Sequence, residues 1–233
     1  MKKHKWEKAW EDKKFSIKTL IPSMLVSKYK KKLKQGDRVL DIGCGNGRNA
    51  IYLARQGCKI DCFDVMDLKW KKELAGDLQE KINFRKSSIL EYPYDVSKYQ
   101  AVILTRVIQY LSRKELSFLI EKIRYGLKPN GFLLLNYNTK GGIFNKEKID
   151  VPTFSYPLHQ IKQLLHTAFK KVIATEGSKR NKYVNYSDNI LTFDIYASDP
   201  HEIQRYNLRK LQYNRAGNFR NFKFSRVKKI ARY

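Results

Sequence analysis

The feature that most constrains the fold is a glycine-rich turn between a short apolar run and an amphipathic segment. The run is Arg38–Ile42, which reads RVLDI, and the turn after it reads GCGNG, with glycines at 43, 45 and 47. Glycine has no Cβ, so such a turn can adopt left-handed conformations and lets a ligand approach the main chain closely. The pattern predicts a strand over 38–42, a tight turn, and a helix over 48–56 that ends at Gly57.

The glycine spacing and the acid in front of it indicate which kind of ligand the turn holds. Dinucleotide sites commonly carry G-x-G-x-x-G and place a pyrophosphate at the helix N-terminus. Here the spacing is G-x-G-x-G, and Asp41 stands two residues before the first glycine. A carboxylate there repels a pyrophosphate and attracts the ammonium group of an amino acid. We therefore expect a zwitterionic, adenosine-like ligand without phosphates.

Apolar runs and amphipathic segments alternate through residues 37–197. Helices are predicted over 23–34 and 71–80, from the capping box Ser112–Glu115 onward, and from Pro157 onward. Further strands are predicted over 59–63, 82–86, 99–105, 132–137, about 170–175 and 189–196, with a turn at 128–131. This order predicts an α/β fold, a Rossmann-like, mainly parallel sheet of seven strands with helices on both faces. Ligands of such a sheet bind at the carboxyl ends of its strands.

The net charge of +26 is concentrated at the two ends of the chain, which defines three regions. A basic N-terminal helical segment, 1–36, carries +9, all from lysines, and the core 37–197 also carries +9. The C-terminal extension 198–233 carries +8, mainly from arginines interleaved with tyrosines and phenylalanines, and its start at 199–202 resembles a helix N-terminus. Arginine and aromatic side chains hold phosphates and stack on bases, so this extension indicates a nucleic-acid partner. Docking of the extension on the core is the alternative.

The three cysteines are Cys44, Cys58 and Cys62, whose spacing matches no disulfide framework. No histidine lies near them, so we expect reduced thiols in the cytoplasm and no metal site. The N-terminus is charged throughout, which does not fit a signal peptide. No apolar stretch approaches the length of a membrane span, and the oligomeric state is left open.

The segment Asp41–Gly47 resembles the first motif of the class I S-adenosylmethionine-dependent methyltransferases. The resemblance implies that Asp41 and the glycines Gly43, Gly45 and Gly47 hold the methionine end of S-adenosylmethionine. It also implies that Asp64, at the end of the second strand, accepts both ribose hydroxyls.

The same resemblance places the adenine against Ser88 and Ile89, and adds Thr105 to the cofactor residues. Many members of the family have Asp where this chain has Ser88. The segment Leu127–Gly131 resembles the family's turn before its fifth strand, which is a structural element.

Within the family, Gly47–Ala54 and Phe154–Leu158 are similar to the tellurite-resistance and thiopurine methyltransferases. Those enzymes methylate small, polarisable atoms. In that branch a histidine with basic neighbours before the last strand serves the substrate. Residues 176–190 of this chain contain Lys179, Arg180 and Lys182 but no histidine.

The acceptor pocket is expected beyond the fourth and fifth strands. The candidate catalytic residues are Arg106, Tyr110, Tyr156 and His159, and the candidate substrate-binding residues are Arg106, Asn138, Lys179 and Arg180. A soft nucleophile needs no base, whereas a hydroxyl or amine acceptor needs a group that takes its proton. The motifs of amino-methylating nucleic-acid enzymes and of cytosine C5 chemistry are absent from the sequence.

Three functions remain open from the sequence. The first is methyl transfer by in-line displacement to an anionic acceptor, with RNA as the leading choice. The second is the same reaction on a small molecule, such as a chalcogen or a thiol, or on an acidic glycan. The third is a nucleic-acid-binding module that keeps the cofactor site without turnover.

Overall fold

The computed structural model describes residues 21–67, 71, 74–138, 152–176 and 192–201. Lys179, Arg180 and nearly all of the predicted C-terminal extension lie outside these residues. Seven strands in the described part form one sheet in the order β3-β2-β1-β4-β5-β7-β6. Their bounds are Arg38–Ile42 (β1), Lys59–Asp64 (β2), Ile82–Lys86 (β3), Tyr99–Thr105 (β4), Leu127–Asn138 (β5), Phe169–Glu176 (β6) and Thr192–Pro200 (β7).

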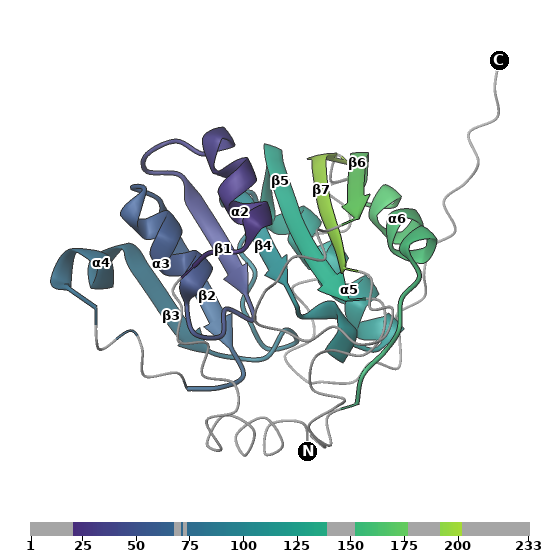
Figure 1. Ribbon diagram of the computed structural model, residues 1–233, viewed down its shortest axis with the longest axis horizontal. Helices are drawn as coiled ribbons and strands as arrows, with labels where there is room; N and C mark the ends of the chain where they lie inside the picture. Colours follow the sequence, from purple (N-terminus) through teal and green to yellow (C-terminus); the bar gives the residue numbers. More distant parts are fainter. Residues whose placement is uncertain (1–20, 68–70, 72–73, 139–151, 177–191, 202–233) are drawn as a thin grey trace. The chain divides into compact units, whose positions relative to one another are not determined.

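Neighbouring strands from β3 to β5 are parallel, and β7 runs antiparallel to both β5 and β6. The predicted fold class, a mainly parallel Rossmann-like sheet, is therefore confirmed. In Figure 1 the arrowheads of β1, β2 and β4 lie at one edge of the sheet, the lower one. The order of parallel strands reverses between β1 and β4, and ligands bind beside such a reversal.

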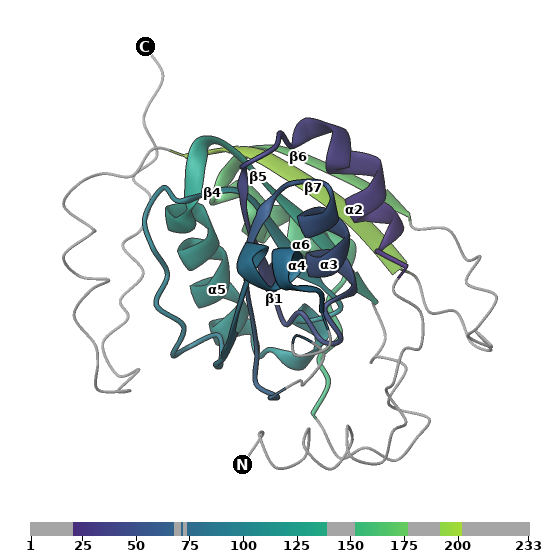
Figure 2. The same cartoon turned by 90° about the vertical axis from the view of Figure 1, so that its left-hand side faces the viewer.

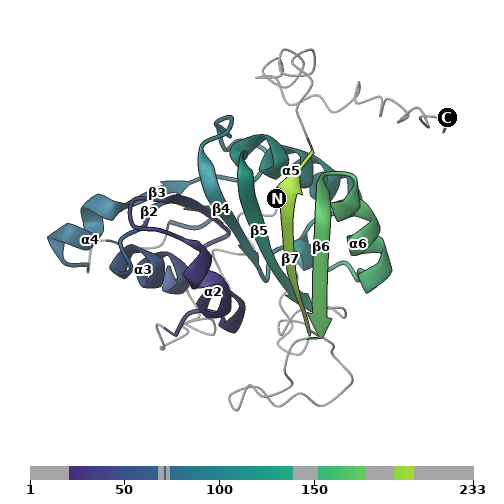
Figure 3. The same cartoon turned by 90° about the horizontal axis from the view of Figure 1, so that it is seen from above.

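Helices cover both faces of the sheet because successive strand residues point to opposite sides. Val39, Ile60 and Ile103 pack under one layer, and Leu40, Phe63 and Leu104 under the other. The first layer contains α2 (Met24–Tyr29), α3 (Arg48–Arg55) and α4 (Gly76–Lys81), and the second contains α5 (Arg113–Gly126) and α6 (Leu158–His166). Figures 2 and 3 show these helices arranged about the sheet. No described helix has the length and apolar composition needed to cross a membrane.

Helix α2 packs on the sheet, although the sequence placed it in the basic N-terminal segment. Leu25 and Val26 are buried, and the ring of Tyr29 stacks on that of Tyr196 in β7 at 4.7 Å. The Ser23 side chain caps the helix by accepting a hydrogen bond from the Val26 amide. The helix ends at Tyr29, and a 3-10 turn, η1 (Lys30–Lys32), replaces the rest of the helix predicted to reach residue 34.

Two predictions about element boundaries in the second half of the chain are wrong. Residues 128–131, predicted as a turn before the strand, lie within β5, where Tyr99 pairs with Leu127 but Ala101 pairs with Phe132. The extra residues bulge from the ladder without ending the strand. Asp199 and Pro200, expected to begin a helix, belong to β7, and Pro200 pairs with Phe169. The compact unit that contains the sheet ends at His201, whose amide donates to the Ala168 carbonyl.

The helix predicted over 71–80 is shorter than expected, because α4 begins at Gly76. The predicted capping box of α5 is present: the Ser112 side chain accepts from the Glu115 amide, and the Glu115 carboxylate accepts from the Ser112 amide. Two of the four amides left open at a helix start are thereby satisfied.

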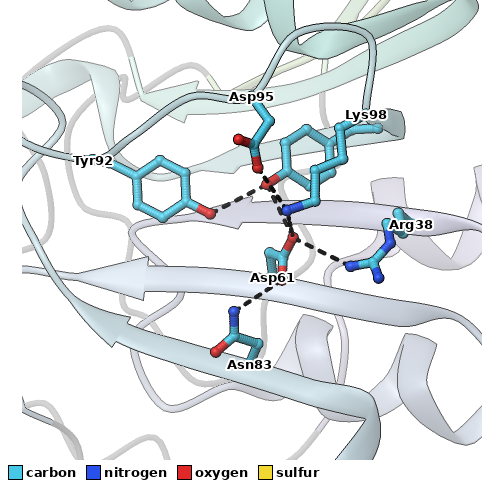
Figure 4. A network of polar contacts seen from close by, with 7 residues as sticks. Arg38, Asp61, Asn83, Tyr92, Asp95 and Lys98 are labelled. Carbon is cyan, nitrogen blue, oxygen red and sulfur yellow. Dashed lines mark hydrogen bonds and ion pairs between the residues drawn. The ribbon is translucent and has the colours of Figure 1, made fainter.

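A buried acid, Asp61, lies in the middle of β2 with its side chain on the α5 side of the sheet. Figure 4 shows it surrounded by polar partners from the amino ends of β1, β3 and β4. Its carboxylate accepts from Lys98 Nζ (2.9 Å), Tyr99 Oη (3.0 Å) and Asn83 Nδ2 (3.1 Å), and Arg38 Nη1 lies at 3.7 Å. Burial alone raises the pKa of Asp61, but the hydrogen bonds from Lys98, Asn83 and Tyr99 outweigh it and hold the pKa below its usual value.

Candidate cofactor and acceptor site

The glycine turn between β1 and α3 has the conformation that only glycine adopts readily. Gly43, Gly45 and Gly47 have φ values of 65°, 54° and 73°. The amides of Gly43 and Cys44 donate to the Phe63 carbonyl at 2.9 and 3.1 Å, which attaches the turn to β2. A Cβ added to Gly43 would lie 2.5 Å from Cγ2 of Val107, in the segment after β4.

We expect Gly43→Ala to lower the free energy of unfolding by about 3 kcal/mol, because the methyl group meets both a left-handed backbone and the Val107 side chain. Gly36→Ala is the matched control: its φ is 83°, but no described atom lies within 4 Å of the added Cβ. The control should lose about 1 kcal/mol, from backbone strain alone. Urea denaturation measures both, and equal losses would contradict a steric role for Val107.

Asp41 lies directly before this turn, and its carboxylate is almost completely buried, with 1% of the residue exposed. Neither carboxylate oxygen has a hydrogen-bonding partner of normal geometry among the described residues. Burial raises the pKa of Asp41 to about 7, and Asp64 adds to the shift while Arg48 and the Ala50 amide oppose it. A buried acceptor group without a donor is unfavourable, so the site is suited to a ligand that brings a cation.

Asp64 ends β2 on the other side of the turn. Its two carboxylate oxygens accept from the amides of Gly45 (3.0 Å) and Met66 (3.1 Å). Burial raises the pKa of Asp64, and these amides oppose the shift. Each oxygen keeps a further acceptor position, which is what a vicinal diol requires.

The segment after β3 lies beside Asp64, because the Ser87 amide donates to the Asp64 carbonyl at 2.8 Å. This contact brings Ser88 and Ile89 to the same edge of the sheet as the predicted ribose carboxylate. The Ser88 hydroxyl donates to the Glu91 carboxylate at 2.9 Å, within its own turn, and Ile89 is half-buried.

Thr105, at the end of β4, is joined to α3 by a residue that the sequence did not single out. Asn49 donates from Nδ2 to Thr105 Oγ1 at 3.1 Å, and its Oδ1 accepts from the Ser23 amide at 2.9 Å. Asn49 therefore ties together α2, α3 and β4. The sequence signal for Asn49 is a polar side-chain amide on the otherwise apolar face of α3.

Arg106 follows β4 directly and has a left-handed backbone, with φ of 61°. Its amide donates to the Asn136 carbonyl at 2.8 Å, and its Nε donates to Asn136 Oδ1 at 3.0 Å. Burial lowers the pKa of Arg48, at the start of α3, and the positive charge of Arg106 lowers it further. The positive charges of Arg48 and Arg106 therefore act on one another across the edge of the sheet at which Asp41 lies.

The remaining predicted catalytic residues are placed differently. Tyr110 is buried in η3 (Ile108–Tyr110), where burial raises its pKa while Gln109 and the charge of Arg106 oppose the shift. Tyr156 is buried, and its hydroxyl donates to the Leu111 carbonyl at 2.6 Å. His159 is exposed on α6, and Asn138 is buried at the end of β5. The structure thus brings Tyr110 near Arg106, engages Tyr156 in a contact of the fold, and leaves His159 exposed on α6.

The residues of this edge fit S-adenosylmethionine. The Asp41 carboxylate makes no hydrogen bond of normal geometry with a described residue, and the ammonium group of the methionine end would supply the missing donor. The Arg48 guanidinium has the charge that the methionine carboxylate requires. Asp64 has acceptor positions for the ribose hydroxyls, and Ile89 offers an apolar surface for a base. No phosphate has to be accommodated.

Comparisons with known proteins agree with this description. Residues 39–131 match the family described as "Methyltransferase domain". The ribosomal protein L11 methyltransferase of Campylobacter concisus is 35% identical over 127 residues, which are 52% of this chain and 39% of that protein. A ubiquinone biosynthesis O-methyltransferase of Rickettsia akari is 30% identical over 100 residues, which are 42% of this chain and 39% of that protein. The chain thus spans about two fifths of the length of these relatives.

Solved structures share the fold over a larger part of the chain. The 1,6-didemethyltoxoflavin-N1-methyltransferase of Burkholderia thailandensis, with bound S-adenosylhomocysteine, aligns with a TM-score of 0.70 and 14% identity, over 85% of this chain and 87% of that one. Phosphoethanolamine N-methyltransferase 2 of Haemonchus contortus, in complex with S-adenosylmethionine, aligns with a TM-score of 0.61 and 18% identity, over 80% of this chain and 55% of that one. With the strand order, these findings show that the described part of the chain has the fold of S-adenosylmethionine-dependent methyltransferases, and that residues 39–131 match the methyltransferase domain family.

Proposed function

We propose that this chain transfers the methyl group of S-adenosylmethionine to an anionic acceptor by in-line displacement. The observation that carries the proposal is the buried Asp41 carboxylate, which lies directly before the glycine turn and makes no hydrogen bond of normal geometry with any described residue. The cofactor supplies an electrophilic methyl group on a sulfonium, whose carbon–sulfur bond breaks as the bond to the acceptor forms, leaving the electron pair on sulfur.

The chain's own residues bind and orient both reactants. Asp41 and Arg48 take the two charges of the methionine end, and Asp64 takes the ribose hydroxyls. Holding donor and acceptor about 3–3.5 Å apart in line is the main contribution of such a site. The Tyr110 hydroxyl is protonated at neutral pH, since burial raises its pKa further above neutrality, so Tyr110 does not take the proton of the acceptor.

The charge of the site supports an anionic acceptor. The guanidinium groups of Arg48 and Arg106 influence one another, and the methionine carboxylate neutralises one of them. Arg106 remains to bind an anionic group of the acceptor. RNA is the leading choice because the sequence from 198 to 233 interleaves arginines with aromatic residues.

A small acceptor, such as a thiol or a chalcogen, is the second candidate. Its support is the similarity of Gly47–Ala54 and Phe154–Leu158 to the tellurite-resistance and thiopurine branch. A soft nucleophile of this kind reacts without a base, which agrees with a site in which Tyr110 stays protonated.

A transfer assay with labelled S-adenosylmethionine tests the reaction and separates the acceptors. Total RNA, an acidic glycan fraction, selenite and tellurite, and a small-thiol panel are offered to the full chain in parallel. We expect label in RNA. Label only in thiols or chalcogens would replace the leading acceptor with the second, and cofactor binding without transfer to any fraction would contradict an enzymatic function.

The RNA proposal has its own test in the salt dependence of binding. We expect Arg215→Gln, Arg220→Gln and Arg226→Gln together to weaken RNA binding and to lower the slope of log affinity against log salt by about 2 to 3. The matched control removes three positive charges from the exposed surface of α6 and β6, at Lys162, Lys170 and Lys171. Equal changes in both triple variants would show a nonspecific effect of net charge and contradict the proposal.

A further inference from the structure

We propose that Asn136 and Asp194 are positioning residues, which hold the Arg106 guanidinium in one orientation to bind the anionic group of the acceptor. This inference rests on the proposed function, because it assigns Arg106 to the acceptor. It adds two residues on β5 and β7 that the sequence did not single out.

The three side chains form a chain of hydrogen bonds that joins the segment directly after β4 to β5 and β7. Arg106 Nε donates to Asn136 Oδ1 at 3.0 Å, and Asn136 Nδ2 donates to Asp194 Oδ1. Asn136 lies opposite Asp194 in the β5–β7 ladder and opposite Thr105 in the β4–β5 ladder. Paired residues of neighbouring strands point to the same face, so the register of the sheet builds the contact between Asn136 and Asp194, and Arg106 joins it from the residue after Thr105.

The chemistry of the row fixes the orientation of the Asn136 amide. Its oxygen faces a donor on Arg106, and its nitrogen faces a carboxylate on Asp194. Turning the amide over would oppose donor to donor and acceptor to acceptor, so both neighbours favour the same orientation. The negative charge of Asp194 thus acts on Arg106 through the Asn136 amide that lies between them. Each of the two hydrogen bonds involves a charged group, and such hydrogen bonds are stronger than those between neutral groups.

This arrangement leaves most of the guanidinium for a ligand. Arg106 uses Nε for the row, and its terminal nitrogens make no hydrogen bond or ion pair with any residue the structure describes. A carboxylate in direct contact would occupy those nitrogens, whereas the Asn136 amide takes only one donor. The terminal nitrogens form the fork that carboxylates and phosphates bind in two-point fashion.

The backbone of Arg106 is held as firmly as its side chain. Its φ of 61° is uncommon for a residue with a Cβ. The Arg106 amide donates to the Asn136 carbonyl at 2.8 Å, and the Arg106 carbonyl accepts from Gln109 Nε2 at 2.9 Å. Residues that keep such a conformation cluster at functional sites, because the surrounding contacts must compensate for the strain. Here the conformation occurs at the carboxyl end of β4, beside the reversal of strand order.

The Nε–H resonance of Arg106 in a ¹⁵N spectrum of the full chain tests the row directly, with inorganic phosphate as the probe ligand. The resonance is identified by its absence in Arg106→Lys. In the wild type we expect slow hydrogen exchange at this group and a shift on addition of phosphate. Asn136→Ala and Asp194→Asn should speed the exchange and weaken phosphate binding about 10-fold. Asp194→Asn preserves the shape of the side chain, so it gives an answer even if Asn136→Ala does not fold.

The control is Thr175→Ala, because Thr175 Oγ1 donates only to the main-chain carbonyl of Asp194, at 3.4 Å. It should leave the Arg106 resonance and the phosphate affinity unchanged. Unchanged exchange and affinity in Asp194→Asn, or a wild-type resonance that phosphate does not shift, would overturn the inference.

Cofactor affinity separates this inference from the proposed function. Both positioning variants should bind S-adenosylmethionine within about twofold of the wild type, because the row does not include Asp41 or Asp64. A wild-type chain that binds phosphate through Arg106 but transfers no methyl group would overturn the proposed function, and with it the assignment of this anion site to an acceptor.

Discussion

Asp41→Asn is expected to weaken the binding of S-adenosylmethionine about 100-fold at pH 8, because the buried charge that faces the ammonium group is removed. The same change should stabilise the protein without cofactor. Isothermal calorimetry measures the first effect and urea denaturation the second. Asp67→Asn, which removes an exposed carboxylate from the segment after β2, is the control and should change neither.

The sign of the pH dependence follows from the pKa of Asp41, about 7 in the folded protein and 3.8 ordinarily. A raised carboxyl pKa means that ionisation opposes folding, so the penalty is absent below about pH 3.8 and fully present above about pH 7. Its upper limit is about 4 kcal/mol, and Asp41→Asn should recover part of it at pH 8. Cofactor affinity of the wild type should fall about 10-fold from pH 8 to pH 6, as Asp41 gains a proton. Equal affinity and equal stability in wild type and Asp41→Asn would contradict this account of the site.

Asp61→Ala is expected to lower the free energy of unfolding by about 3 kcal/mol, because it removes the acceptor shared by the buried polar network of Figure 4. The Tyr99 hydroxyl then loses its carboxylate partner and keeps only its contact with Tyr92 Oη at 3.2 Å. Lys98 and Arg38 stay partly hydrated, with 28% and 46% of their side chains exposed. The expected loss of unfolding free energy therefore lies at the lower end of the range for breaking a buried ion pair.

Asp95→Ala is the matched control, because Asp95 also pairs with Lys98, at 2.7 Å, but its side chain is 57% exposed. It should cost less than about 1 kcal/mol. The lowered pKa of Asp61 stabilises the fold above its ordinary value of 3.8, and this contribution is lost as pH falls through the lower, folded value. Asp61→Ala should therefore flatten the acid side of the stability profile. A loss equal to that of Asp95→Ala would show that the network contributes no more than a surface ion pair.

The parts of the fold that local patterns determine were predicted closely. Strands 38–42, 82–86 and 99–105 have the predicted bounds, because each is a short run between turn residues, and the capping box marked the start of α5. The bulge at 128–131 and the extension of β7 to Pro200 were missed. Both depend on pairing with distant strands, which overrides the local preference of Pro and Gly for turns.

The residues of the candidate site were likewise predicted where a local sequence motif marks them, and missed where their partners lie on distant elements. Asp41, Asp64 and the glycines belong to one continuous motif and its neighbouring strand, and they lie together at one edge of the sheet. Their roles toward the cofactor remain predictions. Asn49, Asn136 and Asp194 gave no pattern in the sequence, because their partners come from other strands and helices. Only the register of the assembled sheet places an amide between an arginine and a carboxylate.

Calorimetric titration of S-adenosylmethionine into the full chain, at pH 6 and pH 8 in buffers of different ionisation enthalpy, tests whether Asp41 binds the ammonium group of the cofactor. We expect binding of one cofactor per chain, with close to one proton released at pH 6 and little at pH 8, because the ammonium group forces Asp41 to ionise. Asp41→Asn should abolish the proton release. No heat of binding at millimolar cofactor, or binding without proton release at pH 6, would contradict this role of Asp41.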